Sequence, residues 1–221
     1  GNKKLNISKM KKQILIAGLL MVSAITFGQK KEIKIAQKAI NNGDFSGAIS
    51  TLKGVEGLVS NADSNVKEQY YLVKAEAYIG GAGNDYKKMN AAAAAYEKVL
   101  SLNKNSKYAA EAKIGLQETI NVLLISAQLD QSSQEYLEGS KKLYRGYTLS
   151  KKDTIYLYYA ASLAKDGQAY DAAIKYYEEL IDISYTGIKE EFYATKKDTK
   201  EESKFESAEE RNLALKKGEY I

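Results

Sequence analysis

The 221-residue sequence contains no cysteine, histidine, proline or tryptophan. Without cysteine the chain forms no disulfide and offers no thiolate as a nucleophile or metal ligand. Without histidine it lacks the commonest general base and the commonest ligand of metal ions. We therefore expect no metal site, no cofactor and no enzymatic activity.

The absence of proline favours helical structure, because proline is the residue that most strongly interrupts helices. An all-β fold would need many turns, and turns commonly use proline. Hydrophobic residues make up 44% of the chain, which argues against global disorder. The composition therefore predicts a folded, all-α protein.

The excess of positive charge is confined to the first 28 residues. The formal net charge is +5, and residues 1–28 contain five lysines and no acidic residue. The rest of the chain has equal numbers of basic and acidic residues. The basic balance therefore belongs to the N-terminal segment, and it predicts no nucleic-acid partner.

Residues 10–28 have the pattern of a secretory signal peptide. Two lysines follow Met10, an apolar run extends to Phe27, and small residues precede a predicted cut after Gly28, with a cut after Ala24 as the second choice. The alternative is an uncleaved anchor, but the run of about 14 residues is shorter than the roughly 20 that span a membrane.

We therefore expect an exported protein, periplasmic or secreted, with no stable membrane span after signal cleavage. Residues 1–9 are interpreted as upstream read-through or expression-vector residues, because the signal pattern is complete from Met10.

Residues 29–185 show the pattern of four consecutive helix pairs. Apolar residues recur at helical spacing, and glycine-containing turns join the two halves of the first, second and fourth pairs. The expected pairs cover residues 30–58, 64–102, 108–149 and 154–183. The sequence thus predicts a helical-repeat solenoid of antiparallel helix pairs.

The fourth pair shows this pattern most clearly. Asp153 is a candidate N-cap, and one stripe of the first helix consists of Leu157, Ala160, Ala161 and Ala164. The second helix is expected to bury one face made of Tyr170, Ala173, Ile174, Tyr177, Leu180 and Ile181. Other tyrosines at packing positions, expected in the core, are Tyr71, Tyr78 and Tyr96.

Small residues recur at matching positions in the two helices of each pair. The matched residues are Ala36/Ala48, Ala75/Ala92, Ala127/Gly139 and Ala161/Ala173. Two helices at a short interaxial distance need small side chains where they cross. The matched positions therefore predict where the helices of each pair touch.

This pattern resembles the tetratricopeptide repeat family, whose helix-turn-helix motif of roughly 34 residues has small residues at fixed positions. The residues that fit the family register best are Ala161, Tyr170, Ala173, Tyr177 and Leu180. The resemblance covers about residues 30–185, although the family's tryptophan and closing proline are missing. With a leader that ends in Gly28-Gln29, the chain resembles secreted and periplasmic tetratricopeptide proteins of Bacteroidetes-type bacteria.

Residues 186–221 break the helical pattern. Phe192 and Phe205 bracket a polar, turn-like segment, which favours a small β-hairpin insertion near residues 190–206 over a solvated loop. Ser207 is expected to cap a short helix that ends near Gly218. One interpretation of this end is that it leads into further repeats.

The resemblance implies that the first helices of the pairs line a groove for a partner protein or peptide. In the family register the groove residues are Gln37, Gln69, Glu76, Asn121, Gln128, Tyr158, Ser162 and Lys165. Tyr158 is the expected aromatic anchor. The other residues are polar and nearly uncharged, which favours an extended polypeptide bound through amide hydrogen bonds.

The expected function is therefore a protein- or peptide-binding scaffold in the cell envelope. The alternative is a cell-envelope assembly factor that recognises peptidoglycan or an outer-membrane protein. A hydrolase would need a site of carboxylates alone, and paired glutamates such as Glu178-Glu179 point in different directions on a helix. The glycine-rich stretch at residues 80–83 lacks the lysine of a phosphate loop and is interpreted as a flexible turn.

Overall fold

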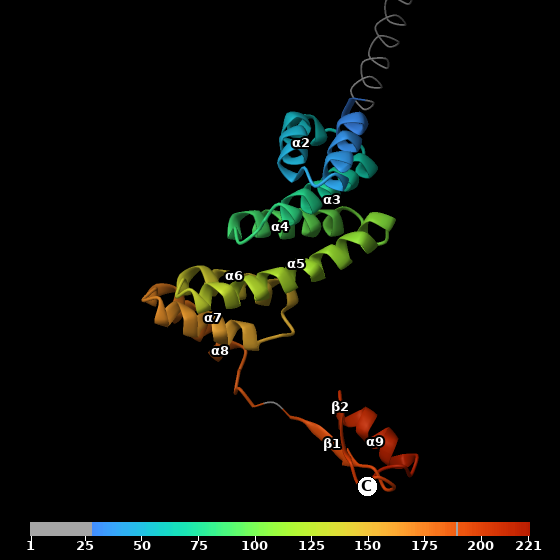
Figure 1. Ribbon diagram of the computed structural model, residues 1–221, viewed down its shortest axis with the longest axis vertical. Helices are drawn as coiled ribbons and strands as arrows, with labels where there is room; N and C mark the ends of the chain where they lie inside the picture. Colours follow the sequence, from blue (N-terminus) through green and yellow to red (C-terminus); the bar gives the residue numbers. More distant parts are fainter. Residues whose placement is uncertain (1–27, 189) are drawn as a thin grey trace, which may run out of the picture. The chain divides into compact units, whose positions relative to one another are not determined.

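The computed structural model describes residues 28–188 and 190–221, so the predicted signal peptide lies outside the described residues except for Gly28 (Figure 1). The chain divides into two compact units, one that ends at Ile181 and one from Asp182 to Ile221. Helices build the first unit, and a β-hairpin with a short helix builds the second. The expected fold class, helix pairs followed by a small hairpin, is confirmed.

Consecutive helices of the first unit pack in antiparallel pairs (Figure 1). Residues 28–41 are helical and pair with α2 (Phe45–Val59). The next two pairs are α3 (Ser64–Gly80) with α4 (Tyr86–Leu102), and α5 (Lys107–Ser132) with α6 (Tyr136–Ser150). The last pair is α7 (Ile155–Asp166) with α8 (Tyr170–Asp182).

Side-chain caps fix where several of these helices begin. The capping residues, each accepting a hydrogen bond from a backbone N–H of the first turn, are Asp44, Asp63, Asp85 and Ser106. Such caps satisfy donors that have no partner inside the helix. The expected cap at Asp153 is wrong. Helix α7 begins after Thr154, and Asp153 Oδ2 instead accepts a hydrogen bond of 2.6 Å from Ser150 Oγ.

The small residues expected at the helix crossings are buried throughout the first unit. Gly139 in the third pair shows the reason for their size. A Cβ atom at this position would lie 3.1 Å from the carbonyl oxygen of Ala127 on α5 and 3.1 Å from Leu163 Cδ1 on α7. Glycine therefore lets α6 approach both neighbouring helices.

Two predictions about core tyrosines are one residue out of register. Tyr70, not Tyr71, is the fully buried ring of α3, and Tyr176, not Tyr177, is the buried ring of α8. Neighbouring tyrosines are equally apolar, so the sequence pattern does not decide which one the adjacent helix covers. The buried face of α8 is made of Ala173, Tyr176 and Leu180. Three residues that were predicted to be buried, Tyr170, Ile174 and Ile181, are exposed.

The second unit is built on a two-stranded antiparallel sheet. Strand β1 (Phe192–Thr195) pairs with β2 (Glu202–Phe205), and the register places Phe192 opposite Phe205. Helix α9 (Ala208–Lys216) follows, and Ser207 Oγ caps it by accepting the N–H of Glu210 at 3.1 Å. Ile221 exchanges two backbone hydrogen bonds with Thr195, which holds the end of the segment against β1.

Candidate functional site

A groove of about 490 Å³ lies between α5 and α7. Its apolar lining consists of Leu124, Ala127, Leu143 and Leu163. Its polar and aromatic lining consists of Gln128, Gln131, Tyr156, Tyr159, Ser162 and Asp166. A volume of this size is typical of pockets that bind a small ligand or a few side chains of a partner.

Contacts of α6 hold both walls of the groove in place. Gly139 packs against the backbone of Ala127 on α5, as described above. The Ser140 hydroxyl donates a hydrogen bond of 2.7 Å to the carbonyl oxygen of Ala160 on α7. One turn further along α6, Leu143 lines the groove and is 9% exposed. The groove is therefore preformed by the packing of three helices.

The lining of the groove carries little charge. Asp166 is the one acidic residue among the lining residues, and Lys165 Nζ lies 3.4 Å from its Oδ1. The other polar groups are amides and hydroxyls, which both donate and accept hydrogen bonds. Burial raises the pKa of Tyr156, and the nearby charge of Asp153 raises it further, so this phenol keeps its proton and can act as a donor.

Two of the eight residues predicted to bind a partner, Gln128 and Ser162, line this groove. Lys165 contacts the groove residue Asp166. Tyr158 is 42% exposed and leans against Tyr159, with the ring centroids 5.8 Å apart. The part of the predicted surface on α7 therefore lies at the groove or beside it.

The other predicted residues lie elsewhere along the first helices of the pairs. Gln37 Nε2 donates a hydrogen bond of 3.4 Å to Asn41 Oδ1 on its own helix, and the Gln37 amide partly offsets the rise in the pKa of Glu76 on α3. Gln69 Nε2 donates to the hydroxyl of Tyr108, which joins α3 to α5. Asn121 is exposed on α5. The structure thus spreads the predicted residues along several first helices and does not gather them in one site.

The sequence prediction missed the aromatic wall of the groove. Tyr156 and Tyr159 lie on the face of α7 that also carries Ser162 and Asp166. Tyr159 and Tyr156 lie three and six residues before Ser162. Residues three apart are neighbours on a helix surface, so this spacing could have identified both tyrosines. The prediction selected Tyr158 because it followed the family register instead of the spacing from Ser162.

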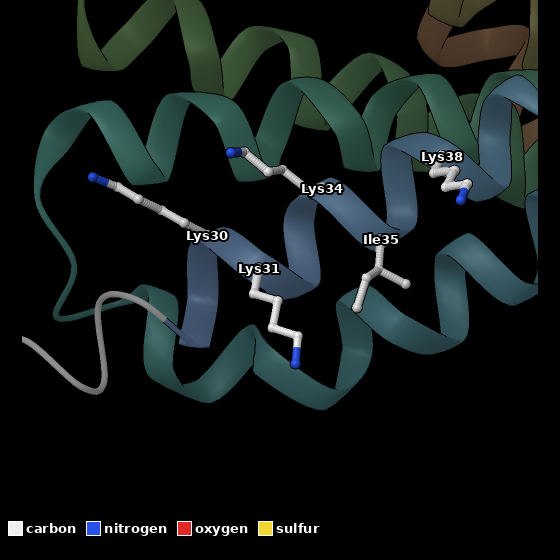
Figure 2. A pocket seen from close by; sticks show the side chains of 5 residues that line it. All are labelled: Lys30, Lys31, Lys34, Ile35 and Lys38. Carbon is white, nitrogen blue, oxygen red and sulfur yellow. The ribbon is translucent and has the colours of Figure 1, made fainter.

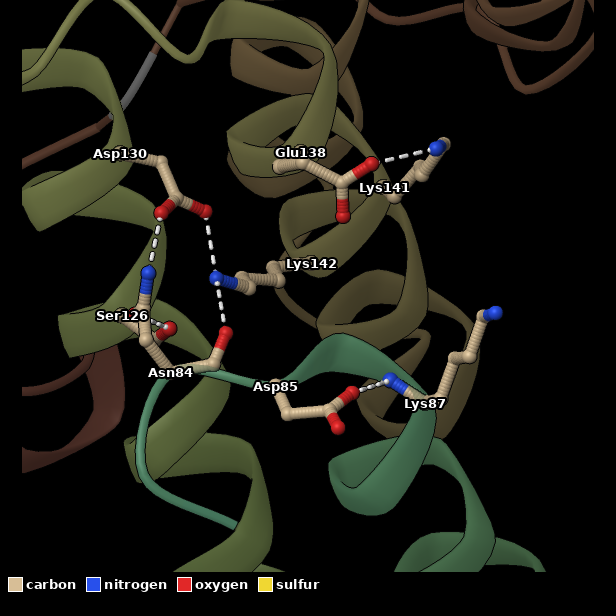
Figure 3. Close-up of polar contacts among 8 residues, drawn as sticks. All are labelled: Asn84, Asp85, Lys87, Ser126, Asp130, Glu138, Lys141 and Lys142. Carbon is tan, nitrogen blue, oxygen red and sulfur yellow. Dashed lines mark hydrogen bonds and ion pairs between the residues drawn. The ribbon is translucent and has the colours of Figure 1, made fainter.

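A second cluster of polar side chains is buried where the turn between α3 and α4 meets α5 and α6 (Figure 3). Lys142 Nζ donates to Asp130 Oδ2 at 2.5 Å and to the carbonyl oxygen of Asn84 at 2.9 Å. The side-chain amide of Asn84 donates to Asp130 Oδ1 at 2.6 Å and accepts a hydrogen bond from the Ser126 hydroxyl.

This cluster is structural, because a substrate has no access to it. The side chains of Lys142 and Asp130 are 1% and 3% exposed. The hydrogen bonds fix Asn84 at the end of the glycine-rich stretch, and Lys88 Nζ donates to the carbonyl oxygen of Gly81 at 3.0 Å. The turn that was expected to be flexible is therefore held from two sides.

The described residues contain neither a metal-binding cluster of side chains nor a membrane-spanning helix. No group of three or more acidic side chains in them is arranged to hold a metal ion. None of the helices in this part of the chain is both long and apolar enough to cross a membrane.

Comparison with known proteins does not identify a family. No protein-family model matches the sequence, and no curated protein matches it. The chain is therefore described by its architecture, as a mostly helical protein of consecutive packed helix pairs with a small hairpin at its C-terminal end.

Proposed function

We propose that this protein is a binding scaffold of the tetratricopeptide type, which holds an extended segment of another protein in the groove between α5 and α7. The observation that carries the proposal is the groove itself, which is lined by apolar side chains and by hydrogen-bonding side chains of which Asp166 alone is charged. Because packing against α6 holds both walls, binding requires little ordering of the scaffold. The signal-like sequence at residues 10–28 supports action in the cell envelope.

The lining indicates which segment would fit. An aliphatic side chain would cover Leu143 and Leu163, while the amide groups of the bound backbone would pair with Gln128. Tyr159 is 49% exposed and would pack against the bound segment as an aromatic anchor. A strongly charged segment would lose hydration without finding partners in this lining. We therefore propose an uncharged segment with an aliphatic residue at its centre.

Binding is proposed in preference to catalysis because of the available chemistry. The sequence has no histidine or cysteine, and the groove lining includes a single carboxylate, that of Asp166. A pair of carboxylates facing each other, as glycoside hydrolysis needs, is not present among the described residues that line this groove.

The test uses peptides selected from a displayed random library with the intact protein. The groove variant combines Gln128→Ala with Tyr159→Ala. The matched control combines Gln117→Ala with Tyr170→Ala, which removes one exposed glutamine from α5 and one exposed tyrosine from α8, both outside the groove lining. We expect the groove variant to weaken peptide binding at least about tenfold, as loss of an aromatic anchor does.

The selected peptides should also be uncharged at their centre, and the control variant should bind them like the wild type. Equal weakening by both variants would place the binding surface outside the groove. A selection that yields only charged peptides would contradict the proposed chemistry of the lining.

A further inference from the structure

The helix over residues 28–41 carries a lysine-rich face (Figure 2). Four lysines and one isoleucine line a shallow depression of about 400 Å³ on this helix, and these residues are Lys30, Lys31, Lys34, Ile35 and Lys38. We call these five residues the lysine face. Successive members of the lysine face are alternately one and three residues apart in the sequence, and this spacing places them on one side of the helix.

Burial of the opposite side of the helix fixes the direction of the lysine face. Ile33 and Ala36 are 3% and 0% exposed and belong to the core shared with α2 and α3. Gln29 Nε2 also donates a hydrogen bond of 2.9 Å to the carbonyl oxygen of Leu58 on α2. The helix is therefore held in place, and the lysine face is exposed, with Ile35 at 44%.

The positive charge of the lysine face has no counterpart among the described residues. None of its four ammonium groups forms an ion pair with a side chain in the described part of the chain. Glu32, on the same helix, is partly buried and does not line the depression. Since the chain after residue 28 has no net charge, the lysine face is a local concentration of charge in a neutral protein.

We infer that the lysine face binds the surface of an anionic phospholipid membrane. Each lysine near such a surface strengthens binding by a factor of about five, because its ammonium group is attracted to the anionic headgroups. Ile35, at the edge of the face, would enter the outer layer of the lipid, with the aliphatic stems of the lysines beside it. This combination of charge and one aliphatic contact fits reversible binding at the surface.

A nucleic acid fits the same face less well. Single-stranded nucleic acids are held by aromatic rings or arginine planes that stack on bases, in addition to positive charge. The lysine face has neither an aromatic ring nor an arginine. The aliphatic side chain of Ile35 can enter a lipid layer, but it has nothing to contact on a phosphate backbone.

The position of the lysine face in the sequence supports the same partner. Lys30 follows Phe27, the end of the apolar run predicted to enter the membrane during export, by three residues. If the leader is cut after Gly28, the lysine face lies at the new N-terminus. If it is not cut, the face lies where the chain leaves the membrane. The uncut form would hold the lysines at a lipid surface, and the cut form would leave them at an exposed end of the protein. Neither form depends on the groove between α5 and α7.

The test measures how the protein, purified in the form that export yields, partitions onto lipid vesicles. One set of vesicles is phosphatidylcholine alone, and the other has equal parts of phosphatidylcholine and phosphatidylglycerol. The test variant combines Lys31→Gln with Lys34→Gln. The matched control combines Lys98→Gln with Lys113→Gln, which removes the same charge from exposed positions on α4 and α5.

We expect the test variant to bind the phosphatidylglycerol vesicles about 30-fold more weakly than the wild type, from two lost lysine contacts. The control variant should bind the phosphatidylglycerol vesicles like the wild type. Raised salt should weaken the binding of the wild type and of the control variant. Ile35→Ser should weaken binding to vesicles while leaving binding to soluble inorganic polyphosphate unchanged. Circular dichroism confirms that each variant keeps its helices.

Three results would overturn the inference. The first is equal binding of the two double variants to the phosphatidylglycerol vesicles. The second is wild-type binding that does not distinguish the two kinds of vesicle. The third combines two observations: the wild type binds polyphosphate as tightly as it binds vesicles, and the Ile35→Ser variant binds both like the wild type. That result would make the face a site for soluble polyanions.

Discussion

Glu76 on α3 is a carboxylate whose surroundings oppose its charge. Burial raises its pKa, a hydrogen bond from Gln37 partly opposes that effect, and the nearby charge of Glu111 on α5 adds to it. The pKa of Glu76 is therefore higher in the folded protein than in the unfolded chain. At a pH above both pKa values, the Glu76 carboxylate is charged in the folded and in the unfolded protein. Only in the folded protein do its surroundings oppose that charge, so the charge lowers the free energy of unfolding.

We predict that Glu76→Gln increases the free energy of unfolding at pH 7 and that this advantage disappears in acid. Below the ordinary value of 4.5, Glu76 is protonated in both states, so its burial no longer opposes folding. As the pH rises through the pKa of the unfolded chain and then through that of the folded protein, the loss of stability caused by the buried charge grows to its full size. Urea unfolding of both proteins across this range measures the difference, and a wild type as stable as the variant at pH 7 would contradict it.

Close approach of α4 and α5 at Gly115 gives a prediction about how these elements pack. A Cβ atom on Gly115 would lie 2.3 Å from Tyr96 Cζ, and the Tyr96 side chain is buried at 3% exposure. We predict that Gly115→Ala lowers the free energy of unfolding by about 2 kcal/mol, because the ring has little room to move aside. This loss would outweigh the helix propensity of about 1 kcal/mol that alanine adds.

Gly54→Ala on α2 is the matched control for this prediction. Gly54 also lies inside a helix, but a Cβ atom there would have no neighbour within 4 Å. The substitution therefore changes the free energy of unfolding only through the higher helix propensity of alanine. We expect this variant to be as stable as the wild type or more stable. Thermal unfolding of both variants decides the matter. A Gly115 variant that behaves like the Gly54 variant would show that Tyr96 moves freely.

Where several elements begin was predictable from local signals, although the cap expected at Asp153 was not found. Asp44 and Ser106 precede helices that they cap, and Ser207 does the same for α9. Phe192 and Phe205 correctly indicated the hairpin and pair with each other in its register. These signals depend on residues close together in the sequence, so they need no knowledge of the tertiary fold.

The burial of single side chains was less predictable than the helices themselves. Helical spacing indicated an apolar stripe on α3, but the packing of the neighbouring helices selected Tyr70 and left Tyr71 at the edge of the core. The groove has the same origin, since Gln128 and Leu143 become neighbours only when α5, α6 and α7 pack together. Sequence spacing could have found Tyr159 from Ser162, but it could not have found Leu143.

In the first unit as a whole, the buried cluster around Lys142 links elements that are distant in the sequence. Asn84 belongs to the turn of the second helix pair, while Asp130 and Lys142 belong to the two helices of the third. Each residue by itself looks like a solvated polar side chain in the sequence. In an array of helix pairs, where stability comes largely from contacts between neighbouring pairs, such a link couples one pair to the next.

We predict that Lys142→Met lowers the free energy of unfolding by about 3–5 kcal/mol, because it leaves the Asp130 carboxylate buried without its charged partner. Lys141→Met is the control, since Lys141 and Glu138 form an exposed pair at 2.5 Å worth at most about 1 kcal/mol. Hydrogen exchange should quicken in α4, α5 and α6 of the Lys142 variant more than in α2, because the cluster joins the second pair to the third. Uniform quickening across the unit would show instead that its helix pairs unfold as one cooperative body.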